Sequence, residues 1–178
     1  MTGSSTPRVL FLWELSAGHI ANLRRTKPMF EAHPDIDAVV VGVRNWDEGG
    51  RLERMGLGAI SSRLRPSIEF RQHLRAEDWD AVYVSSVGLR GNVKAVSRFP
   101  NVLDTDATPG QMAAMPEYDM ERFGPDSFRE FYDRRMARSA TMISAWSQWA
   151  ADGHVDLGID ADRIAVNPPG VDLSLIHI

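Results

Sequence analysis

The sequence predicts an α/β protein with a Rossmann-like, doubly wound, mostly parallel sheet and helices on both of its faces. Three observations predict this fold class. Six short apolar runs recur along the 178 residues, most segments between them are long enough for a crossover helix, and no β-hairpin signal joins two runs. Crossovers between parallel strands are right-handed and place their helices on the faces of the sheet.

The first three runs have the length and the continuous hydrophobic character of strands that are buried on both faces, and the fourth is shorter. We therefore expect six strands. In chain order they cover residues 8–13, 37–43, 80–85, 101–104, 141–145 and 163–166.

Helical spacing of apolar residues fills four of the segments that follow these runs. Pro28 is expected to kink the first helix, and Pro66 is expected to open the second. Gly158 has the position of a C-terminal stop for the last helix. The predicted helices cover residues 19–32, 66–76, 127–140 and the stretch from Trp146 to Gly158.

Composition excludes several classes of protein. Hydrophobic residues make up 43% and charged residues 25%, as in an ordinary globular domain, and no run approaches the roughly 18 apolar residues of a membrane span. The chain has no cysteine, which excludes disulfides, thiolate metal sites and cysteine nucleophiles. Its net charge of −4 gives no overall attraction to nucleic acid. Because the N-terminus lacks a signal-peptide pattern, we expect a cytoplasmic protein.

In a doubly wound sheet, ligands bind at the carboxyl ends of the strands, so the loops after strands are the candidate sites. The first such loop ends in Gly18 and His19, where a helix begins and its free N–H groups favour an anion. His19 is a candidate ligand contact or proton carrier. In the alternative interpretation, Gly18 only makes a tight turn and His19 only bonds the loop. The loop matches neither the dinucleotide fingerprint nor a P-loop, and the five histidines lack zinc spacing.

A short acidic motif, Asp104-Thr105-Asp106, directly follows the fourth strand. It resembles the aspartyl nucleophile segment of haloacid-dehalogenase-like phosphatases, although no lysine follows Asp104. It also resembles the metal-binding Asp-x-Asp of GT-A glycosyltransferases. In the structural alternative, one aspartate caps the loop and the other is solvated.

The segment from Thr108 to Gly124 has the length of a functional loop or lid, or of a surface insertion packed by its own methionines. The helix after it carries a basic face. A solvated surface, a peripheral contact with anionic lipid and a contact with an anionic partner all stay open for this face. Its basic residues are Arg129, Arg134, Arg135 and Arg138.

The ordered set of motifs resembles family 4 glycosyltransferases. The most specific segment is Asn167-Pro168-Pro169-Gly170-Val171-Asp172, which resembles the stretch between the two domains of those enzymes. Four further segments agree with the family in order and spacing: 9–22, 104–109, 144–151 and 158–163.

The resemblance implies the N-terminal half of a GT-B fold, in which two Rossmann-like domains face a cleft. Residues 1–166 would form the acceptor-side domain, and 167–178 the interdomain linker with a foreign or truncated tail that resembles translated sequencing adaptor. The activity implied is that of a bacterial retaining enzyme of the hexosyltransferase type. It would use a nucleotide-sugar donor, bound by the missing C-terminal domain, and a sugar or lipid-linked acceptor at the inner face of the membrane. The family needs no metal or other cofactor, and this fragment is expected to be inactive.

Carried over by position, the resemblance implies six substrate-binding residues and no assigned catalytic residue. Gly18 and His19 would lie near the donor diphosphate or the acceptor, and Ser147 would open a helix that faces the cleft. Asp106, Thr108 and Tyr118 would line the acceptor side. Two alternative functions remain: a stand-alone ligand-binding α/β module without catalysis, and a phosphatase that uses Asp104 and Asp106.

Overall fold

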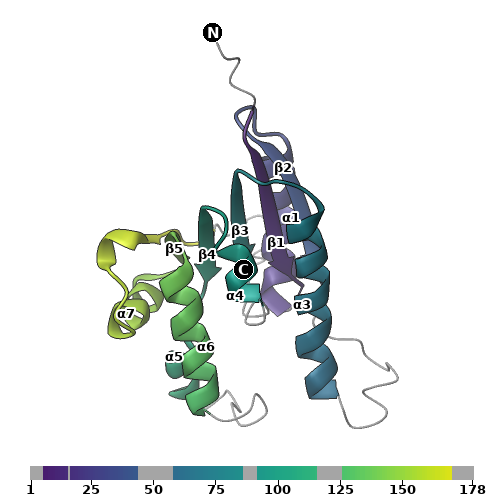
Figure 1. Ribbon diagram of the computed structural model, residues 1–178. Helices are drawn as coiled ribbons and strands as arrows, with labels where there is room; N and C mark the ends of the chain where they lie inside the picture. Colours follow the sequence, from purple (N-terminus) through teal and green to yellow (C-terminus); the bar gives the residue numbers. More distant parts are fainter. Residues whose placement is uncertain (1–5, 16, 44–57, 86–91, 116–125, 170–178) are drawn as a thin grey trace, which may run out of the picture.

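The computed structural model describes residues 6–15, 17–43, 58–85, 92–115 and 126–169. Its six strands form one sheet in the order β2-β1-β3-β4-β5-β6, and every neighbouring pair is parallel (Figure 1). The chain first moves from β1 outward to β2 and then crosses back over β1 to β3. The order of the sheet therefore reverses between β1 and β3, which confirms the predicted doubly wound fold class.

The strands fall where the apolar runs predict them, to within one residue at either end. The buried strand β1 (Arg8–Glu14) lies between β2 (Asp37–Val43) and β3 (Ala81–Ser85). The other half of the sheet consists of β4 (Asn101–Thr105), β5 (Met142–Ala145) and β6 (Ile164–Val166). All six carboxyl ends share one edge of the sheet, because all six strands are parallel.

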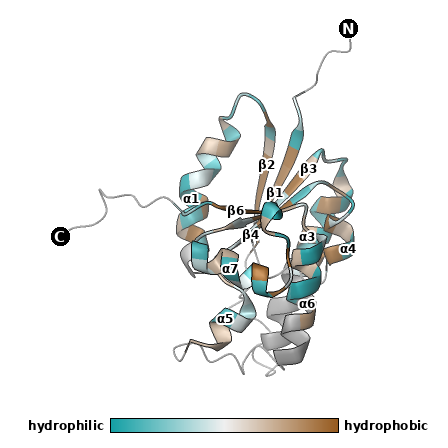
Figure 2. Ribbon diagram, turned by 90° about the vertical axis from the view of Figure 1, so that its left-hand side faces the viewer, coloured by the Kyte–Doolittle hydropathy of each residue, from teal (hydrophilic) through white to brown (hydrophobic). Residues whose placement is uncertain are grey.

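Helices cover the two faces unequally. On one side of the sheet lies α1 (Ala17–Glu31), whereas α3 (Gly58–Ala76), α4 (Val93–Val96) and α6 (Asp126–Ser139) lie on the other (Figure 2). The helix α7 (Gln148–Asp156) joins the α6 side, since its alanines pack with Ala145 of β5. Gly158 ends this helix with a φ of 78°, as predicted, because that backbone conformation favours glycine.

Two helical predictions need correction. The helix α3 begins at Gly58 rather than at Pro66, so Pro66 lies inside it. A proline there removes one intrahelical hydrogen bond while its φ still suits the helix, so the helix continues in both directions. The segment after Thr108, predicted to be a loop, begins with the short helix α5 (Pro109–Ala113). Thr108 and Gln111 cap α5 reciprocally, and Pro109 fits its first position.

Alternation along the strands separates an apolar face from an aromatic and polar one. Side chains such as Leu10, Leu12, Val82 and Val84 point toward α3 and form the main core with Phe70. Their neighbours in sequence point toward α1, where the rings of Phe11, Trp13 and Tyr83 pack against Phe30. Further along this second face, near the carboxyl edge, follow the buried polar residues Ser85, Asp104 and Ser144.

Candidate substrate-binding site at the carboxyl edge of the sheet

His19 lies at the reversal point of the sheet, in the first turn of α1. Its ring Nδ1 lies 3.4 Å from Oγ of Ser85, the last residue of β3. Its backbone carbonyl accepts a hydrogen bond of 3.1 Å from the indole N–H of Trp13 in β1. The two strands at the reversal point thus fix the position of the imidazole.

Asp104 is the most deeply buried acid in the described part of this edge, with only 3% of the residue exposed. Its Oδ2 accepts a hydrogen bond of 3.0 Å from the indole N–H of Trp146, which directly follows β5. The Trp146 ring also lies 5.1 Å from the ring of His19, tilted by 42°. Through Trp146, the ends of β3, β4 and β5 form one continuous cluster.

Three more side chains extend this cluster along the sheet. Burial and then the negative charge of Asp104 raise the pKa of the Tyr83 hydroxyl far above its ordinary value, so this hydroxyl stays protonated. Ser144 lies opposite Asp104 in register, and its Oγ accepts a hydrogen bond of 3.3 Å from Nδ2 of Asn167. Hydroxyl, amide, imidazole and carboxylate groups beside an aromatic ring suit a ligand rich in hydroxyl groups.

The structure places the predicted site residues in different situations. Gly18 and His19 both lie in the first turn of α1, and His19 joins the cluster. Asp106 is exposed just after β4. Tyr118 lies outside the described residues. The hydroxyl groups of Thr108 and Ser147 accept backbone N–H bonds as the N-caps of α5 and α7. The substrate roles of these six residues stay predictions.

Sequence reasoning missed several members of the cluster. In the sequence nothing marks Ser85, Tyr83 and Ser144 as different from other strand residues. What brings them together is that they lie on the same face of the sheet, which only the fold shows. Trp146 directly follows a strand and lies in one of the candidate loops, but its pairing with Asp104, 42 residues earlier, could not be predicted from the sequence. Asn167 belongs to the predicted linker, and its bond to Ser144 depends on the tertiary fold.

The two acid-based interpretations of the Asp104 motif gain no support from the geometry. Asp104 is buried against Trp146, whereas Asp106 is exposed. In the described ranges, no group of three or more histidine or acidic residues could hold a metal ion. No helix within those ranges is long and apolar enough to cross a membrane.

The glycosyl transferase 4-like domain family matches residues 20–170, which is most of the chain. The chain belongs to this family. The match covers β2 to β6. It begins one residue after His19 and includes the other residues of the cluster, namely Tyr83, Ser85, Asp104, Ser144, Trp146 and Asn167. The resemblance drawn from the sequence motifs is thereby confirmed at the level of the family.

Solved structures share the fold of this glycosyl transferase 4-like domain. The UDP-GlcNAc 2-epimerase of Neisseria meningitidis, bound to UDP-GlcNAc, has a TM-score of 0.59 and 11% identity over 89% of this chain. A putative UDP-N-acetylglucosamine 2-epimerase of Listeria monocytogenes has a TM-score of 0.63 and 12% identity over 90%. HepE of Anabaena, in complex with UDP, has a TM-score of 0.53 and 18% identity over 94%.

The chain spans less than half the length of these structures, namely 45%, 44% and 45% of them in that order. No curated protein sequence matches the chain. At these identities the structural likeness establishes the fold, and the family match establishes a glycosyltransferase-type domain.

Proposed function

We propose that this glycosyl transferase 4-like domain is the acceptor-side half of a retaining glycosyltransferase. In this proposal the intact enzyme moves a sugar from a nucleotide-sugar donor to a sugar or lipid-linked acceptor. The observation that carries the proposal is the buried Asp104–Trp146 pair beside His19, at the reversal point of a parallel sheet. Ligands of doubly wound folds bind at this position.

The chemistry of the cluster supports a carbohydrate acceptor. The exposed Asn167 supplies both a donor and an acceptor for sugar hydroxyl groups, and the half-buried His19 supplies a ring nitrogen. The buried Asp104 acts behind them by holding Trp146 in place. The Trp146 ring offers an apolar surface of the kind that packs against the face of a sugar. Because Asp104 is already hydrogen-bonded to Trp146, the two groups are held in place before a ligand arrives.

The donor side of the proposal rests on different support. The Neisseria meningitidis epimerase is bound to UDP-GlcNAc and HepE to UDP, and the chain spans under half of each. A second lobe would therefore hold the nucleotide, and a retaining outcome follows from the resemblance to family 4. We expect the 178-residue chain alone to transfer no sugar from UDP-GlcNAc or UDP-glucose. Robust turnover by the purified chain would contradict this part.

A glycan array tests the acceptor side directly. The labelled 178-residue chain is expected to be retained by a restricted set of sugars, and His19→Ala and Asp104→Asn are expected to lose that retention. The matched control is Asp78→Asn, which removes an exposed carboxylate before β3, at the opposite edge of the sheet. Retention that is equal in all four proteins, or absent from the wild type, would contradict the proposal.

A further inference from the structure

A concave surface lies on the face of the sheet opposite α1, between α3 and α6. The surface is concave because α4, which lies between the long helices α3 and α6, has only four residues and is too short to fill the space between them. The cavity measures about 380 Å³, within the range of about 300–1,000 Å³ that small-molecule pockets occupy. Its floor includes Leu74, Val93 and Ala95.

The charge of this groove is one-sided. Of its nine lining residues, five are cationic and none is acidic, whereas the whole chain carries a net charge of −4. In the described part of the chain, Arg75, Lys94, Arg98 and Arg135 form no ion pair. Like charges gathered around one cavity repel each other, and a bound anion would relieve that repulsion.

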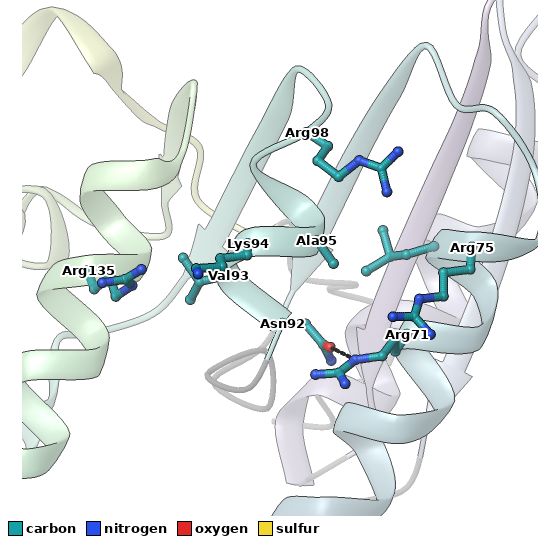
Figure 3. A pocket seen from close by; sticks show the side chains of 9 residues that line it. Arg71, Arg75, Asn92, Val93, Lys94, Ala95, Arg98 and Arg135 are labelled. Atoms are coloured by element: carbon teal, nitrogen blue, oxygen red, sulfur yellow. Dashed lines mark hydrogen bonds between the residues drawn. The ribbon is translucent and has the colours of Figure 1, made fainter.

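The arrangement of the cations suits a phosphate group. The guanidinium groups of Arg71, Arg75 and Arg98 lie on the α3 side of α4, with Lys94 and Arg135 on its α6 side (Figure 3). Guanidinium groups bind phosphate oxygens with two parallel N–H bonds, which makes arginine the better residue for such recognition. A ligand with a phosphate at the three arginines and a second anionic group near α6 would engage both sides.

Arg71 is held in place by a buried neighbour. Asn92, with 1% of the residue exposed, accepts a hydrogen bond of 3.1 Å from Nε of Arg71. Its own Nδ2 donates to the carbonyl of Ser67 in α3. Asn92 thus ties the start of α4 to α3 and fixes the base of one guanidinium group, which lowers the entropy that ligand binding would cost.

We propose that this groove is a binding site for a small phosphorylated ligand carrying at least two negative charges. It is separate from the cluster around His19 and Asp104, because α3, α4 and α6 lie on the other face of the sheet from α1 (Figure 2). The ligand is a phosphate ester, whose source is either a soluble metabolite or the headgroup of an anionic lipid.

Calorimetric titration with inorganic pyrophosphate tests the site. The wild-type chain is expected to bind it saturably, with one site per chain. Arg75→Gln combined with Arg98→Gln should lower the affinity by at least about tenfold, because two charge-assisted contacts are lost. Both side chains are exposed, so the variant should keep its fold, which its circular dichroism and thermal midpoint will check. The matched control, Arg24→Gln combined with Arg25→Gln, removes two exposed arginines from α1.

The outcomes separate the possibilities. Absence of saturable binding, unchanged binding by the groove variant, or an equal loss in the α1 control would each overturn the proposal. A second arm measures co-sedimentation with vesicles of phosphatidylcholine alone or mixed with phosphatidic acid. Co-sedimentation with the mixed vesicles that pyrophosphate displaces and the groove variant loses would identify a lipid headgroup as the source. Pyrophosphate binding without co-sedimentation would identify a soluble phosphate ester.

Discussion

The indole N–H of Trp146 donates a 3.0 Å hydrogen bond to the buried carboxylate of Asp104, across two parallel strands. The backbone N–H of Trp146 also bonds to the carbonyl of Thr105, so the loop after β5 is tied to the end of β4 twice. This relationship holds the candidate site in a fixed shape and makes its energetic role measurable.

Trp146→Phe removes the donor while keeping an aromatic ring. We expect the free energy of unfolding to fall by about 1–3 kcal/mol, because the buried carboxylate of Asp104 loses a partner. Adding Asp104→Asn should cost less in the Phe background than in the wild type, since the neutral amide is easier to bury unpaired. Urea unfolding of the four proteins measures this, with Trp149→Phe as control. Strictly additive losses would show that the two side chains are not coupled.

The raised pKa of Tyr83 leads us to expect a loss of stability at alkaline pH. Its hydroxyl has a strongly raised pKa in the folded state, whereas its pKa in the unfolded chain is about 10. The folded state therefore keeps a proton that the unfolded state loses, and the free energy of unfolding falls as the pH rises above about 10. Denaturant unfolding at increasing pH should show this slope in the wild type and a shallower one in Tyr83→Phe. Identical slopes would argue against the buried hydroxyl.

The burial of His154 leads us to expect a loss of stability at acidic pH. It is 4% exposed, and neither ring nitrogen has a hydrogen-bond partner in the described structure. Burial lowers the pKa of His154 to about 4. Because the unfolded chain takes up this proton near pH 6.5, stability is fully present above that pH and falls as the pH drops toward 4. The loss amounts to at most about 3 kcal/mol.

The variant His154→Leu should remove most of that acid dependence, because leucine is neutral in both states. His33, which is exposed, provides the matched control as His33→Leu. Chemical denaturation between pH 4 and 7 compares the three proteins. If the fall of stability with decreasing pH persisted in His154→Leu and disappeared in His33→Leu, it would belong to His33 and the prediction for His154 would be wrong.

Much of the fold follows from local sequence signals. The first three strands were predictable because β1, β2 and β3 contain continuous apolar runs, as burial on both faces requires. The choice of their carboxyl ends for the candidate site followed from the parallel sheet. The short helix α5 was missed because its cap, Thr108, and its partner, Gln111, lie in a segment rich in proline and glycine. The Asp104–Trp146 bond could not be predicted, since residues far apart in the sequence meet only after the sheet has formed.

Ser147 caps α7, and its predicted contact with substrate can be tested separately from this role. Its hydroxyl accepts the N–H of Ala150 at 3.1 Å, so Ser147→Ala should cost about 1 kcal/mol of stability. Ser147→Asn should keep the stability, because asparagine caps equally well. If Ser147 also binds substrate, both variants will lose retention on the glycan array. Full retention by the stable asparagine variant would leave Ser147 as a cap alone.

The central claim is that the acceptor sugar binds against Trp146 at the carboxyl edge of the sheet. The most direct measurement follows the indole N–H signals of the ¹⁵N-labelled chain during titration with a sugar retained on the array. We predict a saturable shift of the Trp146 signal and no shift of Trp79, whose indole donates to the His73 carbonyl near the opposite edge. A Trp146 signal that stays unchanged while the sugar binds would contradict the account.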